Sequence, residues 1–474
     1  MARTATATKT RSKTAGTRRA ARPRSAEQIA RTALGARPLP DLQRTRPGRA
    51  PTTAQATLDN GLNVVAVRRP SSPMVELRLR IPFGGRGPLH AARAELLAET
   101  ILTGTARRSR QDVDADLAVV GGALSAQVDP QRLLLSGSAL ASGLDVLLDV
   151  LADVLTDATY RSSEVVRERD RLVEHLAISS AQPSVIAREH LQFKRFGVHP
   201  AALEMPSAEV VGGVGPAAVR GLHRRAVVPD GSTLVLVGDI GPARTLERVR
   251  RTLAGWLGER PATTLAEPPA VTGGPVTAFH RDGAVQSQAR LTTPGVLRSD
   301  PDYPAAQLAN IVFGGYFSSR LVENLREDKG YTYHAYSMLE FWPGASAVTV
   351  GYDTTTEATA AALLETRYEL GRIALSPPTD AEVDAARNYA IGSLAGSLSS
   401  QSGYASMLST LAGSGLDGQW LRRHPANLAA TTTEQVAQAA RRIFAPSAVT
   451  GIVVGDLDAV GGDLARLGDV DLPA

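Results

Sequence analysis

Two glutamates and one histidine in the first half of the chain are of types that could bind a metal ion. Glu95 and Glu99 are four residues apart, and a helix places residues at that spacing on one face. The imidazole of His175 could join the two carboxylates as a third ligand. Ala98, between the two glutamates, has no group that could accept a proton from water. We therefore favour the interpretation that these carboxylates pair with nearby arginines rather than hold a catalytic metal.

The hydrophobic pattern predicts the elements that position these residues. Alternating or β-branched runs predict strands at 62–67, 74–81, 133–138, 233–237, 347–350 and 451–454. Amphipathic patterns predict helices at 91–102, 111–120, 141–155, 163–179, 356–373 and 380–397. Strands followed by pairs of helices indicate an α+β fold, with helices packed on one face of a largely antiparallel sheet.

Two segments of the chain, 221–240 and 438–457, align without a gap. The identical residues in the two segments are always 217 positions apart. They include Arg224 with Arg441, Arg225 with Arg442, Pro229 with Pro446, Gly238 with Gly455 and Asp239 with Asp456. Such a constant offset indicates a tandem duplication of a unit of about 220 residues. We expect an N-terminal domain over residues 51–257, a Pro- and Gly-rich linker over 258–276 and a C-terminal domain over 277–474.

The net charge of +5 belongs to the first 50 residues. Residues 1–50 hold 13 Lys and Arg against 2 Asp and Glu, and the other 39 basic and 45 acidic residues leave the remainder at −6. We expect a disordered basic tail and no specific nucleic-acid binding, because the body is slightly acidic. The tail lacks an apolar signal region, and the whole chain has 48 Arg against four Lys, as in a high-GC bacterial sequence, so the expected location is the bacterial cytoplasm. The mitochondrial matrix is the alternative, because an Arg-rich, acid-poor tail is typical of a transit peptide.

Composition excludes several other classes of protein. A chain that is 43% hydrophobic and 21% charged is neither wholly disordered nor collagen-like. With no cysteine, it has no disulfide framework, and any zinc would need His and carboxylate ligands. The apolar runs are too short for a membrane helix.

Several motifs resemble those of the insulinase/pitrilysin family of zinc peptidases. The first copy contains LDNGLNVVAVRRP, IPFGGRGPL and AELLAETILTGTARRS, and the second contains FGGYFSSRLVENLREDKGYTYHAYS. The resemblance covers residues 52–470 and is closest to the two-domain form, which includes mitochondrial processing peptidase and its bacterial relatives. It implies that the chain forms half of a closed peptidase chamber.

Active members of that family carry His-x-x-Glu-His on the first helix, where the histidines bind zinc and the glutamate activates water. Anchoring on Gly104 and Thr105 aligns this motif with Glu95, Leu96, Leu97, Ala98 and Glu99, and aligns the third ligand with His175. All four functional positions are changed. The resemblance therefore implies that this chain binds no metal of its own, is inactive alone, and relies on zinc held by a partner subunit.

The second copy retains the residues that reach the substrate in this family, which align with Arg326 and Tyr333. Arg326 would donate to peptide carbonyls, and the Tyr333 hydroxyl would donate to the oxyanion that forms as water attacks. We expect a helix ending near Gly330 and a strand starting at Tyr331, so that both side chains reach one cavity. The alternative is that Arg326 pairs with Glu323 or Glu327 and that Tyr333 is a core aromatic.

The resemblance thus implies a non-catalytic, substrate-binding subunit of a heterodimeric zinc endopeptidase acting on peptides or unfolded segments. Its partner would be a homologous subunit with an intact zinc motif, and neither a membrane nor a specific nucleic acid is expected as a partner. One alternative is an inert structural protein of the same fold. A second is an autonomous metallohydrolase that uses Glu95, Glu99 and His175.

Overall fold

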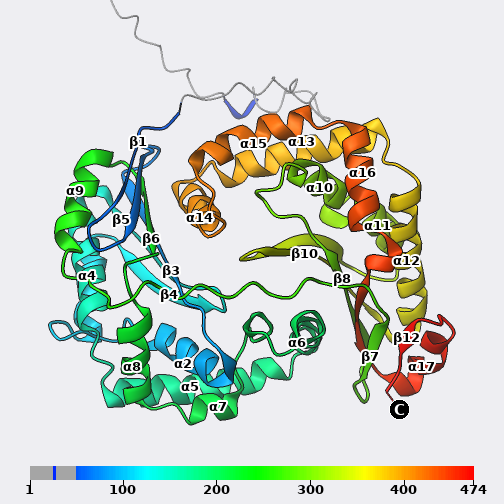
Figure 1. Ribbon diagram of the computed structural model, residues 1–474, viewed down its shortest axis with the longest axis horizontal. Helices are drawn as coiled ribbons and strands as arrows, with labels where there is room; N and C mark the ends of the chain where they lie inside the picture. Colours follow the sequence, from blue (N-terminus) through cyan, green and yellow to red (C-terminus); the bar gives the residue numbers. More distant parts are fainter. Residues whose placement is uncertain (1–24, 28–49, 474) are drawn as a thin grey trace, which may run out of the picture. The chain divides into compact units, whose positions relative to one another are not determined.

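The computed structural model describes residues 25–27 and 50–473, so the predicted basic tail lies almost wholly outside the described residues. Pro51–Ala474 forms one unit, separate from Met1–Ala50. Two six-stranded sheets organise this unit (Figure 1). No helix in the described part of the chain combines the length and apolar character needed to cross a bilayer.

The first sheet has the strand order β1-β2-β6-β3-β5-β4. Its strands are β1 (Thr53–Thr57), β2 (Asn63–Arg68), β3 (Met74–Pro82), β4 (Ala123–Asp129), β5 (Arg132–Leu140) and β6 (Thr233–Gly238). β6 runs parallel to β2, and the other pairs are antiparallel. The helices of this half are α2 (Gly87–Thr100), α3 (Arg110–Val119), α4 (Leu144–Asp157), α5 (Ser162–Ser180), α6 (Pro183–Phe196), α7 (Ala208–Gly212), α8 (Pro216–Ala226) and α9 (Pro242–Thr252).

The second sheet has the order β12-β7-β11-β8-β10-β9. Its strands are β7 (Val276–His280), β8 (Gln286–Pro294), β9 (Ala335–Trp342), β10 (Ala345–Thr355), β11 (Thr450–Gly455) and β12 (Val470–Asp471). The helices are α10 (Tyr303–Asn310), α11 (Arg320–Val322), α12 (Thr359–Leu375), α13 (Asp380–Ser397), α14 (Gln401–Ala412), α15 (Gly418–Ala430), α16 (Thr433–Ile443) and α17 (Leu457–Ala465), with π-helical turns η3 (Ile311–Gly315) and η4 (Glu323–Asp328).

The two halves repeat one topology, as the sequence predicts. β11 lies between a parallel β7 and an antiparallel β8, just as β6 lies between β2 and β3. α8 and α16 start 217 residues apart and precede β6 and β11, which are also 217 residues apart. The α+β fold, the largely antiparallel sheets and the duplication are therefore confirmed.

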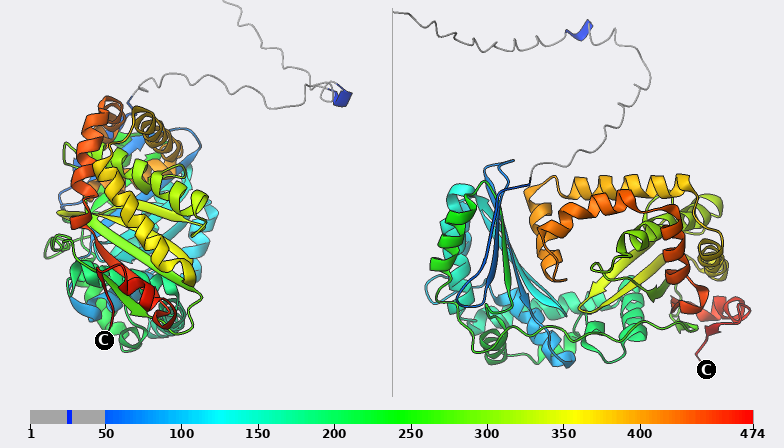
Figure 2. Two further views of the ribbon diagram at one scale, coloured as in Figure 1. Left: turned by 90° about the vertical axis from the view of Figure 1, so that its right-hand side faces the viewer. Right: turned by 45° about the horizontal axis from the view of Figure 1, so that its top comes forward.

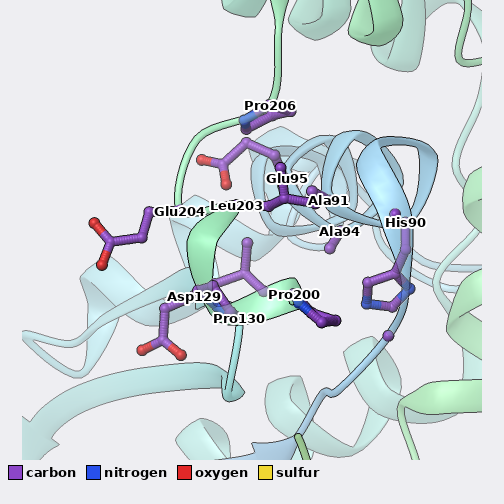
Figure 3. Close-up of a pocket in the computed structure, with 13 residues that line it drawn as sticks. His90, Ala91, Ala94, Glu95, Asp129, Pro130, Pro200, Leu203, Glu204 and Pro206 are labelled. Carbon is purple, nitrogen blue, oxygen red and sulfur yellow. The ribbon is translucent and has the colours of Figure 1, made fainter. Parts of the chain in front are cut away.

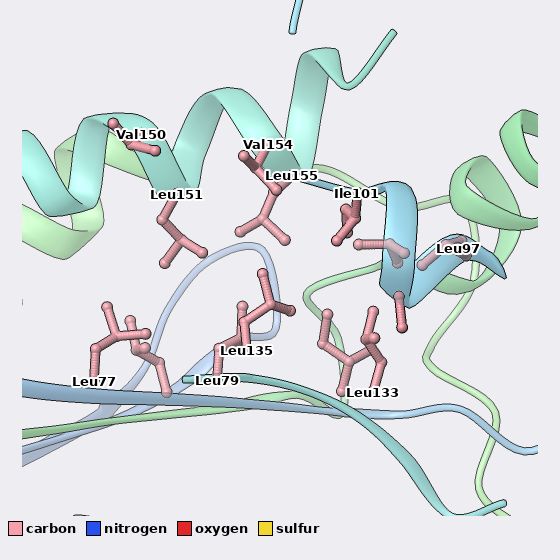
Figure 4. Close-up of a cluster of buried hydrophobic side chains, with 14 of the residues drawn as sticks. Leu77, Leu79, Leu97, Ile101, Leu133, Leu135, Val150, Leu151, Val154 and Leu155 are labelled. Atoms are coloured by element: carbon pink, nitrogen blue, oxygen red, sulfur yellow. The ribbon is translucent and has the colours of Figure 1, made fainter. Parts of the chain in front are cut away.

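Apolar side chains at every second position of the strands form the core of the first half. On β3, Leu77 and Leu79 are fully buried on one face of the sheet, together with Leu133 and Leu135 of β5. Figure 4 shows α4 and α2 above these leucines, with Leu151 and Leu155 of α4 pointing toward them. The buried residues of α4 in this core include Val150, Leu151, Val154 and Leu155. Residues with the opposite parity on β3, such as Arg78, face away from this core.

Each copy also lends one helix to the other copy's sheet. α14 packs against β6 and β3 of the first sheet, and α6 packs against β11 and β8 of the second (Figure 1). The two helices start 218 residues apart, at Pro183 and Gln401, so they are equivalent in the duplication. Arg78 donates to Ser402 and Ser406 on α14, at 2.6 and 3.1 Å. Figure 2 shows the same packing from two further sides.

All twelve strands and helices predicted from the pattern are present, and the largest differences are extensions at their ends. The strand predicted at 347–350, for example, spans Ala345–Thr355. The exchange of α6 and α14 was not predicted, because nothing in an amphipathic pattern says which sheet a helix covers. Residues 258–275 contain no helix and no strand of either sheet, yet Leu265 and Val271 of this segment are buried against Trp342.

Candidate functional site

The altered motif lies on the middle of α2, where two faces of the helix have different roles. Leu96 and Leu97 are fully buried in the core of the first half. Glu95 and Glu99 lie on the other side, with Ala98 between them, and together they line a pocket bounded by β4 and Arg132. The helix is thus held by its leucines, and its two carboxyl groups share one face, as the spacing predicts.

Glu99 is paired with an arginine. Its carboxylate lies 3.0 Å from the guanidinium of Arg171 on α5, and Arg171 also contacts the buried Glu168 at 2.8 Å. Arg171 therefore occupies the space beside Glu99. For Glu99, this contact agrees with the expected pairing of the carboxylates with nearby arginines.

Glu95 has no such partner among the described residues. Burial, together with the charge of Glu99, raises the pKa of Glu95 to about 7. Its side chain points toward a second small pocket that also contains His90 and Glu204 (Figure 3). Near neutral pH about half of the Glu95 carboxyl groups are therefore protonated, and a metal ion would have to displace that proton.

His175 does not complete a metal set with the two glutamates. It is exposed on α5, and its Nε2 lies 3.4 Å from the Ser179 hydroxyl. Within residues 25–27 and 50–473, the one group of three His, Asp or Glu side chains whose ligand atoms all lie within 4.8 Å of one another is His280, Asp456 and Asp458. These three surround the start of α17, where Asp456 caps the helix. Glu95, Ala98, Glu99 and His175 therefore do not fit a zinc ion.

The residues expected to contact substrate lie together in the second half. Arg326 lies close to two aromatic rings, with its guanidinium carbon 4.4 Å from the centre of Phe317 and 5.3 Å from that of Tyr333. All three residues line an open pocket of about 540 Å³. Tyr333 is 87% exposed, so the alternative that it is a core aromatic is wrong. The predicted pairing of Arg326 with Glu327 is present at 3.4 Å, with both side chains partly in solvent.

Local backbone geometry presents these two side chains to the pocket. Arg326 lies in the π-helical turn η4, a form that often marks functional positions. Gly330 follows with φ +68°, so it ends the helix as expected. The strand, however, begins at Ala335 and not at Tyr331. The Thr332 hydroxyl bonds to the backbone of His334 and Asp353, which holds the intervening residues in a turn and leaves Tyr333 free of the sheet.

Two polar contacts, made by the buried side chains of Asn324 and Arg320, anchor η4 and the adjoining α11. The Asn324 amide donates to Glu365 and Glu369 of α12, at 3.0 and 2.9 Å. The Arg320 guanidinium donates to both carboxylate oxygens of Glu382, at 2.6 and 3.0 Å. Burial tends to raise the pKa of Glu382, but the bonds from Arg320 and from the capping residue of α13 lower it to about 2. This ion pair therefore persists through the physiological pH range.

The neighbours of Arg326 and Tyr333 in the sequence differ in whether they reach the pocket. Ser319 precedes α11, yet its buried hydroxyl makes no capping bond to the helix. Trp342 is buried against Phe196, outside the pocket, whereas His334 and Tyr336 do line it. The pocket wall also includes residues that sequence reasoning missed, namely Tyr316, Phe317, Met338 and Tyr389. Phe317 could have been suspected from its place in the quoted motif, but Tyr389 is far along the chain and gives no signal.

Comparison with known proteins places both halves in one group. Residues 63–206 match the family model described as "Insulinase (Peptidase family M16)", and residues 214–389 match the one described as "Peptidase M16 inactive domain". An uncharacterised zinc protease of Mycobacterium bovis is 26% identical over 360 residues, which is 74% of this chain and 81% of that protein. One from Streptomyces coelicolor is 26% identical over 388 residues, covering 79% and 83%.

Solved structures show the same fold. The structure of a peptidase M16 inactive domain from Pseudomonas fluorescens superposes with a TM-score of 0.77 at 21% identity, covering 85% of this chain and 98% of that one. A protease from Helicobacter pylori gives a TM-score of 0.77 at 17% identity, covering 85% and 99%.

Proposed function

The chain belongs to the insulinase (M16) family of zinc peptidases, in its processing-peptidase-like form, and on that premise we propose that it is a non-catalytic, peptide-binding subunit of a heterodimeric peptidase. Members of this family act on peptides and often pair as heterodimers. The partner would be a homologous subunit that carries the intact zinc motif. We further propose that the pair works in the bacterial cytoplasm.

One contrast between the two halves carries the proposal. The residues on α2 lack both histidines and the base of the family motif, and Glu99 is bound to Arg171. In the second half, Arg326 and Tyr333 share an open pocket, and the contacts of Arg320 and Asn324 hold the helical segment that carries Arg326. A chain that has lost the hydrolytic residues but keeps an ordered substrate pocket fits a supporting subunit better than an independent enzyme.

The chemistry assigned to the pocket follows from its donors. The Arg326 guanidinium lies over the rings of Phe317 and Tyr333, which limits its freedom, and its N–H groups could donate to carbonyl oxygens of a peptide in the pocket. Tyr333 is exposed enough for its hydroxyl to donate to the carbonyl oxygen as negative charge develops on it. Activation of water is assigned to the partner subunit, and this chain supplies orientation and charge stabilisation.

The isolated chain gives the first test. We expect a fluorescently labelled peptide to bind without being cleaved, as measured by anisotropy and by mass spectrometry of the products.

Arg326→Ala should weaken binding by about 10-fold or more, because one charge-assisted hydrogen bond is lost. Arg250→Ala is the matched control, since Arg250 is exposed and, among the described residues, its side chain pairs only with Glu247 on its own helix. Tyr368→Phe is the control for Tyr333→Phe, because Tyr368 is 59% exposed on α12.

Two results would contradict the proposal. Equal peptide affinity for Arg326→Ala and Arg250→Ala would remove the role of the pocket and favour an inert structural protein. Stoichiometric zinc binding with peptide cleavage by the chain alone would favour the autonomous metallohydrolase.

A further inference from the structure

A hollow lined by arginines lies in the first half, well separated in sequence from the peptide pocket. Its volume is about 930 Å³, and it is bounded by the last turn of α8, the segment after α9 and the start of α2. Arg224 and Arg225 enter it from α8, and Arg260 enters it from the segment after α9. We call these three residues and the space between them the arginine hollow.

The three arginines have no neutralising partner in the described part of the chain. All are exposed, and none of their guanidinium groups makes a hydrogen bond or an ion pair with a described residue. Glu259 is the one acidic residue among those that line the hollow, and it too forms no ion pair there. The hollow therefore concentrates positive charge on a body whose net charge is −6 by the count above.

The duplication supplies an internal comparison. Arg441 and Arg442 occupy the positions equivalent to Arg224 and Arg225, and both are neutralised, by Glu434 at 3.0 Å and by Asp302 at 3.4 Å. At the 217-residue offset, the position of Glu434 is taken by Ala217 in the first copy. Asp302 precedes α10, and the residue in the same place before α2 is Arg86. The first copy thus has the cations of the pair without their carboxylates.

Helix ends alone do not account for this arrangement. Arginines in the last turn of a helix are stabilised by the helix dipole, which explains why both copies have a pair there. Arg260 is not in a helix, so the dipole gives no reason for a third guanidinium in the same space. The positive potential is also felt by His90 on α2, whose pKa is lowered by burial and, in addition, by Arg93 and Arg225.

From this geometry we propose that the arginine hollow binds a compact anion with two or more negative charges, of the oligophosphate class. Guanidinium groups pair with phosphate oxygens through two parallel hydrogen bonds, and three of them face one space. No residue that lines the hollow belongs to a strand of either sheet, so an acidic peptide would find no sheet edge for its backbone. A phosphate chain needs only the guanidinium donors.

The test is a titration of the full-length protein with sodium tripolyphosphate, followed by hydrogen–deuterium exchange at peptide resolution. We expect protection in residues 221–226 and 257–263. The tripolyphosphate concentration that gives half-maximal protection should rise by about 10-fold or more in Arg224→Ala/Arg225→Ala and, separately, in Arg260→Ala. Arg441→Ala/Arg442→Ala is the matched control and should change this concentration less than twofold. The basic residues 1–50 attract anions equally in every variant, so differences between variants belong to the hollow.

Two outcomes would overturn the proposal. The first is no protection of these segments in wild-type protein at low ionic strength, or equal protection in all variants. The second is stronger protection by a hexaglutamate peptide than by tripolyphosphate, which would make the ligand an acidic polypeptide. Because Arg260 lies in a segment without regular structure, the Arg260→Ala variant still tests the proposal if the double variant on α8 fails to fold. Neither outcome bears on the peptide pocket of the second half.

Discussion

A buried ion pair that joins α6 of the first copy to the second sheet makes a sharp stability prediction. The Arg195 side chain is 1% exposed, and its guanidinium lies 2.6 Å from the Glu340 carboxylate of β9. It also donates to Thr292 at 2.9 Å and to Thr349, and Thr349 donates to the same carboxylate. We predict that Arg195→Leu destabilises the protein by about 3–5 kcal/mol, because it leaves a buried carboxylate without its cation.

The pH dependence separates this explanation from simple loss of packing. Burial alone would raise the pKa of Glu340, but Arg195 and the Thr349 hydroxyl outweigh it and the pKa is lowered. In wild-type protein the pair therefore stabilises above the ordinary glutamate pKa, and this contribution is lost as pH falls through the lower folded value. In Arg195→Leu burial dominates, the folded pKa is raised, and stability falls as pH rises past 4.5. The deficit should be larger at pH 8 than at pH 5.

Urea unfolding at the two pH values measures this directly, with tryptophan fluorescence as the signal. Arg195→Leu/Glu340→Gln should recover part of the loss, since the uncompensated charge is gone. Arg250→Leu is the control, because a surface pair of this kind contributes less than about 1 kcal/mol. A deficit below about 1 kcal/mol, or one that is equal at pH 5 and pH 8, would refute the reasoning.

Three further predictions concern the two candidate sites. The folded pKa of Glu95 is about 7 against an ordinary 4.5, so the stability of the wild-type protein should fall as pH rises between these values. Glu95→Gln should therefore be more stable than wild type by up to about 3 kcal/mol at pH 8 and equally stable at pH 4. Urea unfolding that shows no gain for this variant at pH 8 would contradict the prediction. Arg320→Ala should lower the affinity for peptide, because it removes the contact with Glu382 that holds the helical segment leading into η4. Arg320→Lys should not restore the affinity, because a lysine cannot make both hydrogen bonds to the carboxylate. Wild-type peptide affinity in either variant, measured by anisotropy, would contradict this prediction. Gly330→Ala should cost about 1 kcal/mol, since φ is +68°, and an unchanged unfolding midpoint would show that the turn adapts.

The sequence predicted the fold well because burial is periodic. Leu77 and Leu79, two positions apart on β3, are buried on the same face of the sheet. The duplication that pairs Arg224 with Arg441 appears in the structure as equivalent helices, α8 and α16. It could not predict that α14 covers the first sheet, because that depends on contacts such as those of Arg78 with Ser402 and Ser406. Such long-range polar contacts leave no local pattern.

The candidate site was predicted in its parts but not in its surroundings. The spacing of Arg326 and Tyr333 suggested one shared cavity, and both side chains do line one pocket. The expected strand at Tyr331 was wrong, because Thr332 bonds to the backbone on either side of the turn and keeps Tyr333 out of the sheet. The pairing of Glu99 with Arg171 depends on how α2 and α5 pack, which residue spacing alone does not give.

The central claim is that this chain completes a peptidase site through Arg326 and Tyr333 while the hydrolytic residues belong to a partner. The most direct measurement is steady-state cleavage of a peptide by an equimolar mixture of this chain and a homologous subunit with an intact His-x-x-Glu-His. The account predicts activity that neither subunit has alone, and a fall in kcat of about 10²–10³-fold for Tyr333→Phe, with Tyr368→Phe at the wild-type rate. Wild-type kcat and kcat/KM in a mixture containing Arg326→Ala/Tyr333→Phe would contradict it.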